Sequence, residues 1–225
     1  TVAPLSVVNE QVPYMAFGDS FTSGEGETND AYYLVGTNSV PHTCHNGVRA
    51  YPYLIALRWG IAPKSLACSG AQTADIIGDA PYGGQGGRIS GLGFEALSAA
   101  RTDALQMFTP GIVRQAEFAK RYTPEIITLG IGGIDAGLMD KLQVCLGLDT
   151  CEWVQNPTSK LASAREIAEV YIRARAVIAE LRAASPGVTI VYVGYPEIIN
   201  DTPDAKCGTF LGSLLNAEER VFMGE

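Results

Sequence analysis

Residues 13–26 read PYMAFGDSFTSGEG, in which a short apolar run leads directly into a turn rich in glycine and serine. The apolar run, Pro13–Phe17, has the length and composition of a buried β-strand. A serine just past a strand, followed by small residues, can lie on a turn that exposes its hydroxyl next to backbone N–H groups. Ser20 is therefore a candidate nucleophile for acyl transfer, although turns in general are rich in glycine, aspartate and serine.

Three further β-rich runs follow along the chain, at Ser65–Cys68, Glu125–Leu129 and Val188–Gly194. Segments with helical signals separate them. The clearest is Ala164–Ala184, whose apolar residues recur at spacings of three and four until Ser185-Pro186-Gly187 ends it. Strands that alternate with helices predict a parallel sheet covered by helices on both faces. Right-handed crossovers and the switch-point rule place the four runs in the spatial order second, first, third, fourth.

Two of the other runs also end in small-residue turns. The second run continues as ACSGA around Gly70, and the third continues as GIGGID over residues 130–135. Because ligands bind at the carboxyl ends of parallel strands, we expect Ser20, Gly70 and Ile134 to converge there. A dinucleotide site is excluded, because the GEGE of residues 24–27 lacks the third glycine of GxGxxG and would place carboxylates beside a pyrophosphate.

Length and composition narrow the class of protein. The 225 residues suffice for one α/β core, and we expect a single domain over residues 1–225. The net charge of −8 and the scattered basic residues argue against a nucleic-acid partner. No stretch approaches the roughly 18 apolar residues of a membrane span. No signal peptide opens the chain, and residues 1–11 resemble the start of a mature product.

The five cysteines indicate an oxidising compartment. A disulfide could close the short loop between Cys145 and Cys151, and Cys44 and Cys68 flank a helix-sized segment across which they could meet. Cys207 would then need a partner elsewhere. The alternative is five reduced thiols in a cytosolic protein. No metal site is expected, because the chain has no CxxC pair and only two histidines, which are both in one loop.

The serine-containing turn and the motifs that follow it resemble those of a known family. The run GDSFTSGEG looks like the first sequence block of the GDSL/SGNH hydrolases, and most resembles the secreted branch that contains actinobacterial lipases and esterases. Further matches follow in the family's order, and the resemblance extends over nearly the whole chain from Tyr14 onward. They are Cys44 with the RAYP of residues 49–52, ACSGA around Gly70, GIGGID at residues 130–135, and Tyr195-Pro196.

The resemblance implies a flavodoxin-like three-layer α/β/α sandwich and a secreted, monomeric carboxylic ester hydrolase that needs no cofactor. Its substrate would be a lipid, a short acyl ester or an acylated sugar. Ser20 would be the nucleophile, and the oxyanion hole would combine the N–H groups of Ser20 and Gly70 with an asparagine side chain. The motif residues would be Gly18, Asp19, Gly133 and Asp135. In this branch the cysteines that correspond to Cys44 and Cys68 typically pair.

The third block departs from the family pattern. The family reads Gly-Gly-Asn-Asp where this chain reads Gly132-Gly133-Ile134-Asp135. Isoleucine has no hydrogen-bond donor, and losing one oxyanion donor typically costs about 2.7–4 kcal/mol, a factor on the order of 10²–10³ in rate. Asp135 cannot replace the asparagine when it is ionised, because a carboxylate only accepts hydrogen bonds.

The chain departs further from the family pattern at the catalytic base. The family's histidine lies in a DxxH motif after the fifth strand, and residues 1–225 contain no such motif. His42 and His45 are interpreted as loop residues next to a disulfide and not as the base. We therefore expect the chain to stop before the last strand and its catalytic loop, which would also hold the partner of Cys207. The alternative is a catalytically inactive SGNH-fold domain that binds acyl or glycan ligands.

Overall fold

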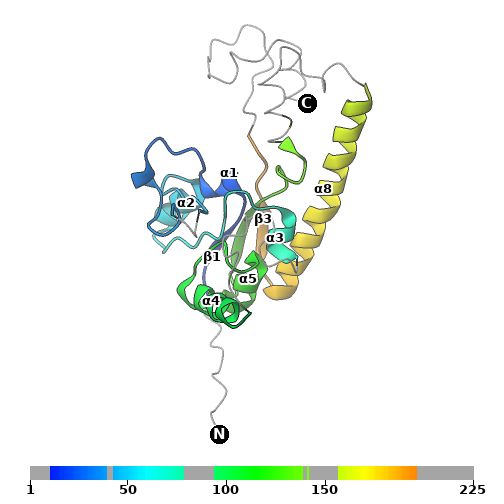
Figure 1. Ribbon diagram of the computed structural model, residues 1–225. Coiled ribbons are helices and arrows are strands. Elements are labelled where there is room, and N and C mark those ends of the chain that lie inside the picture. Colours follow the sequence, from blue (N-terminus) through cyan, green and yellow to red (C-terminus); the bar gives the residue numbers. More distant parts are fainter. Residues whose placement is uncertain (1–10, 40–42, 79–93, 139–140, 142–156, 197–225) are drawn as a thin grey trace. The chain divides into compact units, whose positions relative to one another are not determined.

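A computed structural model describes residues 11–39, 43–78, 94–138, 141 and 157–196. Short strands alternate with helices along the chain (Figure 1). The elements are β1 (Tyr14–Gly18), α1 (Ser20–Ser23), the 3₁₀ helix η1 (Asp30–Tyr32), α2 (Tyr51–Trp59), α3 (Thr73–Ile77), α4 (Phe94–Met107), α5 (Gln115–Tyr122), β2 (Ile126–Gly130), α8 (Pro157–Ala184) and β3 (Thr189–Tyr192).

The three strands form a parallel sheet in the order β1-β2-β3. Phe17 of β1 lies opposite Leu129 of β2, which lies opposite Tyr192 of β3. Strands β1 and β2 begin and end one residue later than predicted, and β3 is shorter than the predicted run. For β1 the reason is that Pro13 has no N–H to give to a ladder.

The second predicted run pairs with β1 but is not a strand. It forms one isolated parallel bridge, between Ala16 and Ser65. Leu66 N–H donates to the Ala16 carbonyl at 2.8 Å, and Cys68 N–H donates to the Gly18 carbonyl at 3.0 Å. A side chain and not a strand meets its other edge, since the Asn46 amide donates to the Ala67 carbonyl. The predicted spatial order is confirmed, while the prediction of a full strand at Ser65–Cys68 is wrong.

Helices cover both faces of this sheet. Side chains alternate between the faces along a strand. On the face that carries Met15 and Phe17, the core also contains Phe118 of α5 and Leu181 of α8. On the other face the ring of Tyr14 packs edge-on against Trp59 of α2, with 5.6 Å between centroids. The predicted α/β fold with three layers is confirmed within this part of the chain.

Helix α8 begins earlier than predicted, at Pro157 instead of Ala164. Proline is favoured in the first turn of a helix, where its missing N–H has no helical partner. Ala174, Val177 and Leu181 are buried, but Ile167 and Tyr171 are 60% and 64% exposed. The apolar periodicity of the sequence therefore marks the core-facing stripe only in the second half of the helix.

The chain divides into two compact units, residues 1–132 with 173–193 and residues 133–172 with 194–225. The first unit holds the sheet and the core described above. Within the second unit, the Lys141 ammonium contacts Glu166 Oε2 at 2.5 Å and also donates to the Ala136 carbonyl. The single domain over residues 1–225 stays a prediction.

Several predictions fall on residues outside the described ranges. They concern Cys145, Cys151 and Cys207, including the disulfide that could close the loop between Cys145 and Cys151. Among the helices that the structure describes, none has both the length and the hydropathy to cross a membrane.

Candidate active site

Strand β1 delivers Ser20 to the carboxyl edge of the sheet. Gly18 ends the strand with φ +153°, and a Cβ atom there would lie 2.2 Å from the Gly130 carbonyl oxygen of β2. Only glycine allows this close approach. Asp19 is 1% exposed, and its side chain caps α1 by accepting from Phe21 N–H at 2.9 Å. Ser20 is then the first residue of α1.

The remaining contacts of α1 hold this turn in place. The Ser20 carbonyl accepts hydrogen bonds from Gly24 N–H at 3.0 Å and from the Ser23 hydroxyl at 3.1 Å. The Thr22 hydroxyl donates to the Gly130 carbonyl at 3.2 Å and accepts from the Tyr51 hydroxyl at 3.3 Å. Burial raises the pKa of Tyr51, which keeps this phenol neutral and able to donate.

The Gly70 turn is bound next to β1. Cys68 N–H donates to the Gly18 carbonyl at 3.0 Å. Gly70 lies two residues after Cys68, and Ser20 lies two residues after Gly18, so both follow this hydrogen-bonded pair at the same spacing. Gly70 itself has φ +81°, a conformation that favours glycine. The predicted placement of the two turns at one edge of the sheet thus agrees with the backbone pairing.

Both turns carry backbone donors that are not used elsewhere. Among the residues that the structure describes, the N–H groups of Ser20 and Gly70 have no hydrogen-bond acceptor, and the Ser20 hydroxyl has no hydrogen-bond partner. Ser20 is partly exposed. Acyl transfer requires an accessible hydroxyl and backbone donors for the oxyanion, and these two turns carry groups of both kinds.

A disulfide connects the Gly70 turn to the loop that follows α1. Cys44 and Cys68 are bonded, as the resemblance implied, and both are fully buried. Ser69 N–H also donates to the Cys44 carbonyl at 3.1 Å, and Gly47 N–H donates to the Ser23 carbonyl at 2.7 Å. The bridge therefore couples the Gly70 turn to α1 through the loop around residues 44–47.

Loss of this disulfide is expected to destabilise the first unit. The two cysteines are 24 residues apart, and replacing Cys68 by serine should lower the free energy of unfolding by about 2–4 kcal/mol in urea. Cys44→Ser should cost as much, and the double variant should cost little more than either single one, because all three lose the same bond. Additive losses, or no rise of one free thiol in the denatured Cys68→Ser protein, would contradict the pairing.

Gln115, at the start of α5, is a positioning residue that the sequence did not reveal. Its side chain accepts from Gly18 N–H and donates to the Gly18 carbonyl, both at 2.9 Å, and it is 1% exposed. It therefore fixes the peptide groups that enter the Ser20 turn. The two residues are 97 positions apart, and no motif marks Gln115 in the sequence.

Replacing Gln115 by leucine should lower the free energy of unfolding by about 1–3 kcal/mol, because the buried Gly18 N–H would lose its acceptor. Urea denaturation measures this change. The matched control is Gln106→Leu on the exposed side of α4, which should stay within about 0.5 kcal/mol of the parent protein. Equal stability of the two variants would show that the Gln115–Gly18 hydrogen bonds do not stabilise the protein.

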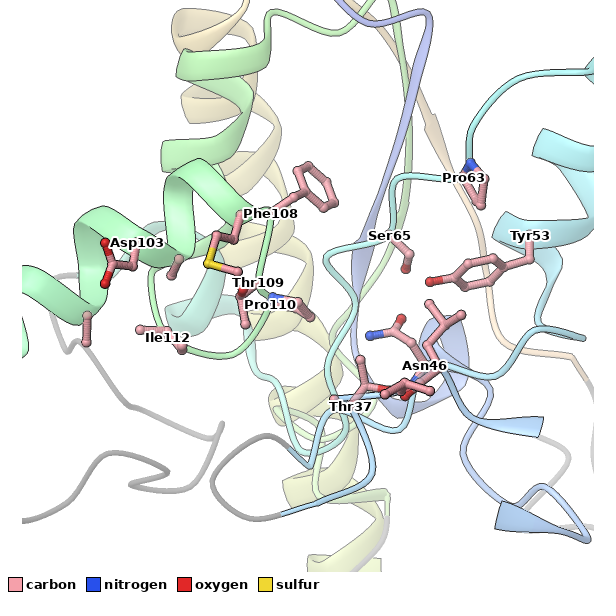
Figure 2. A pocket seen from close by; sticks show the side chains of 16 residues that line it. Thr37, Asn46, Tyr53, Pro63, Ser65, Asp103, Phe108, Thr109, Pro110 and Ile112 are labelled. Carbon is pink, nitrogen blue, oxygen red and sulfur yellow. The ribbon is translucent and has the colours of Figure 1, made fainter. Parts of the chain in front are cut away.

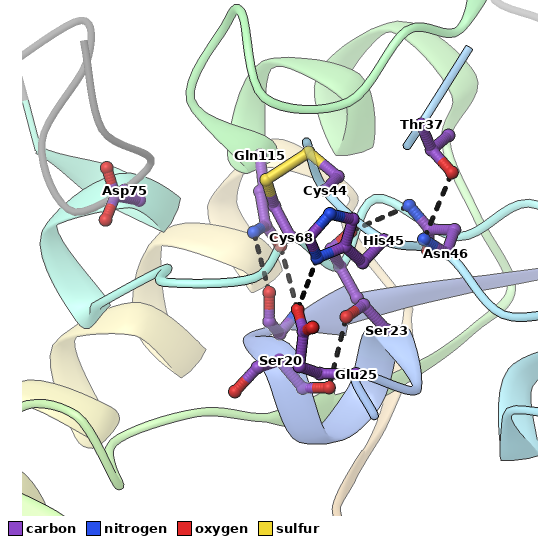
Figure 3. The surroundings of a disulfide bond; sticks show 12 residues. Ser20, Ser23, Glu25, Thr37, Cys44, His45, Asn46, Cys68, Asp75 and Gln115 are labelled. Atoms are coloured by element: carbon purple, nitrogen blue, oxygen red, sulfur yellow. Dashed lines mark hydrogen bonds and ion pairs between the residues drawn. A yellow bond between two sulfur atoms is a disulfide. The ribbon is translucent and has the colours of Figure 1, made fainter. Parts of the chain in front are cut away.

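His45 is held by a carboxylate of the same loop region. Its Nδ1 lies 2.6 Å from Glu25 Oε2, and its ring packs against Tyr33 with 5.1 Å between centroids. Figure 3 shows the Ser20 hydroxyl directed away from the His45 ring. This position agrees with the interpretation of His45 as a loop residue next to the disulfide and not as the base. His42 lies outside the described residues.

Gly133, Ile134 and Asp135 of the third block belong to the second unit, whereas Gly132 belongs to the first. Gly133 N–H donates to the Tyr195 hydroxyl at 2.8 Å, and a Cβ atom on Gly133 would lie 2.9 Å from the Tyr195 ring. Ile134 and Asp135 follow in a turn that Gly137 N–H closes onto the Ile134 carbonyl at 2.9 Å. The Tyr195 ring thus occupies the space next to Gly133 that a side chain there would enter. The role of Ile134 in an oxyanion hole stays a prediction.

Within the described residues there is no group of three or more histidine, cysteine, aspartate or glutamate side chains that could hold a metal ion. That no metal and no cofactor take part stays a prediction.

Comparison with known proteins identifies relatives of the chain. Residues 16–210 match the model of the GDSL-like Lipase/Acylhydrolase family. The chain is 26% identical over 194 residues to Lipase 1 of Streptomyces coelicolor, in an alignment that covers 81% of this chain and 52% of the relative. The chain thus spans about half the length of this curated relative.

Two solved structures are similar in fold. Phospholipase A1 from Streptomyces albidoflavus NA297 is 22% identical, with a TM-score of 0.57 over 94% of this chain and 69% of that one. The extracellular lipase from Streptomyces rimosus is 19% identical, with a TM-score of 0.59 over 95% of this chain and 70% of that one.

Proposed function

This chain belongs to the GDSL-like lipase/acylhydrolase family, and we propose on that premise that it hydrolyses carboxylic esters through an acyl-serine intermediate on Ser20. The observation that carries the proposal is a pair of N–H groups, of Ser20 and Gly70, that have no acceptor in the described part of the chain. They lie in two turns whose preceding segments are hydrogen-bonded to each other at the carboxyl edge of the sheet. The Ser20 hydroxyl, in the first of these turns, is partly exposed.

In the proposed reaction, Ser20 Oγ attacks the ester carbonyl carbon while a general base takes its proton. The carbonyl oxygen becomes an oxyanion and accepts hydrogen bonds from the N–H groups of Ser20 and Gly70. Collapse of this intermediate breaks the bond to the alcohol, which leaves with a proton from the base, and Ser20 keeps the acyl group. Water then attacks the acyl-serine in the same way and releases the acid.

The rigid surroundings of Ser20 support this role. Gln115 fixes both peptide groups of Gly18, Asp19 caps α1, and the disulfide holds the Gly70 turn. Preorganised donors of this kind stabilise the transition state without rearranging during the reaction. The base is expected to be the histidine of a DxxH motif, which residues 1–225 do not contain.

The substrate is proposed to be a carboxylic ester of a lipid, a short acyl chain or a sugar, since the relatives are named as lipases and a phospholipase A1. We also propose that the protein is secreted. The Cys44–Cys68 disulfide favours an oxidising compartment, and one of the structural relatives is described as extracellular. A monomeric state is part of the same proposal.

The test is turnover of a short aryl ester by the protein expressed from its full reading frame, followed by mass spectrometry of an acid-quenched sample. We expect release of the phenol and a population of protein whose mass is raised by one acyl group. The alternative, an inactive SGNH-fold domain, predicts binding of acyl or glycan compounds with no phenol release and no mass change.

A further inference from the structure

A cavity lies in the first unit, and neither the Ser20 turn nor the Gly70 turn is among its described lining residues. It has a volume of about 570 Å³, within the usual range of small-molecule sites. Its walls come from the loop after η1, from α2, from the segment just before the Ala16–Ser65 bridge, and from the end of α4 with the loop that follows. The apolar part of the wall includes Leu34, Pro63, Met107, Phe108, Pro110 and Ile112.

Two buried polar atoms of residues in this wall, Asn46 Oδ1 and Ser65 Oγ, have no hydrogen-bond partner among the residues that the structure describes. The two residues are 1% and 5% exposed. The Asn46 amide nitrogen donates to the Ala67 carbonyl at 3.0 Å, which leaves the oxygen as the unpaired end. Buried polar atoms without partners are rare in proteins because they are costly, so a pair of them in one cavity points to a ligand that completes them.

Tyr53 contributes a third polar group to the same place. Figure 2 shows its hydroxyl and the Ser65 hydroxyl pointing toward each other, with the Asn46 amide beside them. Burial raises the pKa of Tyr53, so this phenol stays neutral and can either donate or accept. The cavity is therefore lined by an apolar wall and by one acceptor and two hydroxyls.

We propose that this cavity binds an uncharged amphiphile with a hydroxyl head group and a hydrocarbon chain. Asn46 Oδ1 can only accept a hydrogen bond, so the ligand must donate one. Asp103 is the only charged side chain among the described lining residues, and the chain has a net charge of −8, which disfavours a carboxylate ligand. The hydrocarbon chain would lie against the apolar wall formed by α4 and the loop after it.

The cavity is separate from the proposed catalytic site. Its lining contains no residue of the Ser20 turn or of the Gly70 turn. Ser65 pairs with Ala16, in the middle of β1, and not with the end of the strand at Gly18. The proposal therefore stands independently of ester hydrolysis and can be tested in a Ser20→Ala protein.

The probe is octan-1-ol, titrated into the Ser20→Ala protein and followed by the NMR signal of the Asn46 side-chain amide. We expect saturable binding, and about 3- to 10-fold weaker binding of 1-methoxyheptane, which has the same length but no donor. Octanoate should also bind more weakly. Equal affinity for all three compounds, or no saturable binding up to the solubility limit of octanol, would overturn the proposal.

A matched pair of variants locates the site. Ser65→Ala should weaken octanol binding about 3- to 10-fold, and it should not lower the melting temperature of the free protein, because the hydroxyl has no partner to lose. The control is Ser163→Ala. Ser163 Oγ is also buried and without a partner in the described ranges, but Ser163 does not line the cavity. Equal octanol affinities of the two variants would overturn the assignment, as would a Ser65→Ala protein that melts markedly earlier.

Discussion

Replacing Ser20 by alanine is expected to reduce kcat for a simple aryl ester by about 10⁴- to 10⁶-fold in the protein expressed from its full reading frame. The physical reason is that the acyl-enzyme route needs an oxygen nucleophile at this position, and water in its place attacks far more slowly. KM should change little, because alanine leaves the backbone donors of Ser20 and Gly70 in place. Steady-state kinetics under pseudo-first-order conditions measure both parameters.

The control for this variant is Ser23→Ala, in the same short helix. The Ser23 hydroxyl donates to the Ser20 carbonyl at 3.1 Å, so its loss removes one neutral hydrogen bond without removing a reacting group. Such a bond contributes about 0.5–1.5 kcal/mol, so kcat should fall by no more than about tenfold. If Ser20→Ala retains activity similar to Ser23→Ala, then Ser20 is not the nucleophile.

Replacing Ile134 by asparagine is expected to raise kcat for the same ester by about 10²-fold. The family pattern has an asparagine at this position, and its amide would add a third donor to the oxyanion while leaving ground-state binding nearly unchanged. The increase should therefore appear in kcat and not in KM. Asp135 should not provide this donor, because an ionised carboxylate has none.

Two further proteins separate this effect from a general change in packing. Ile134→Leu conserves the volume without adding a donor, so its kcat should stay near that of the parent. Ser20→Ala combined with Ile134→Asn should be as inactive as Ser20→Ala alone, since a donor without a nucleophile has little to stabilise. If Ile134→Asn and Ile134→Leu behave alike while Ser20→Ala abolishes turnover, Ile134 does not occupy the oxyanion position.

The sequence predicted the sheet well because its signals are local. Each apolar run that ends in glycine, as at Gly18 and Gly130, marks a buried strand followed by a turn, and right-handed crossovers then fix the order. The prediction of a strand at Ser65–Cys68 was wrong. An apolar run cannot show that the outer edge of this segment meets the Asn46 side chain instead of another strand. Edge pairing depends on residues far away in the chain.

The residues that hold the candidate site in place could not be predicted from the sequence either, because their contacts are also made with residues far away in the chain. Gln115 reads as an ordinary polar residue at the start of a helix, and only the fold brings it to Gly18. The sequence likewise cannot show that the Asn46 and Ser65 side-chain oxygens are buried without a hydrogen-bond partner in the described structure, because this depends on residues that only the fold brings near them. The Cys44–Cys68 pair was implied by the resemblance, whereas spacing alone left a reduced state open.

The central claim is that Ser20 is an activated nucleophile, and covalent labelling tests it most directly. The protein expressed from its full reading frame would be treated with a fluorophosphonate probe, digested, and analysed by mass spectrometry. The account predicts one adduct, on Ser20, which is absent in the Ser20→Ala protein and blocked by prior incubation with a slowly hydrolysed ester. An adduct on another residue, or ester turnover by a protein that the probe does not label, would contradict it.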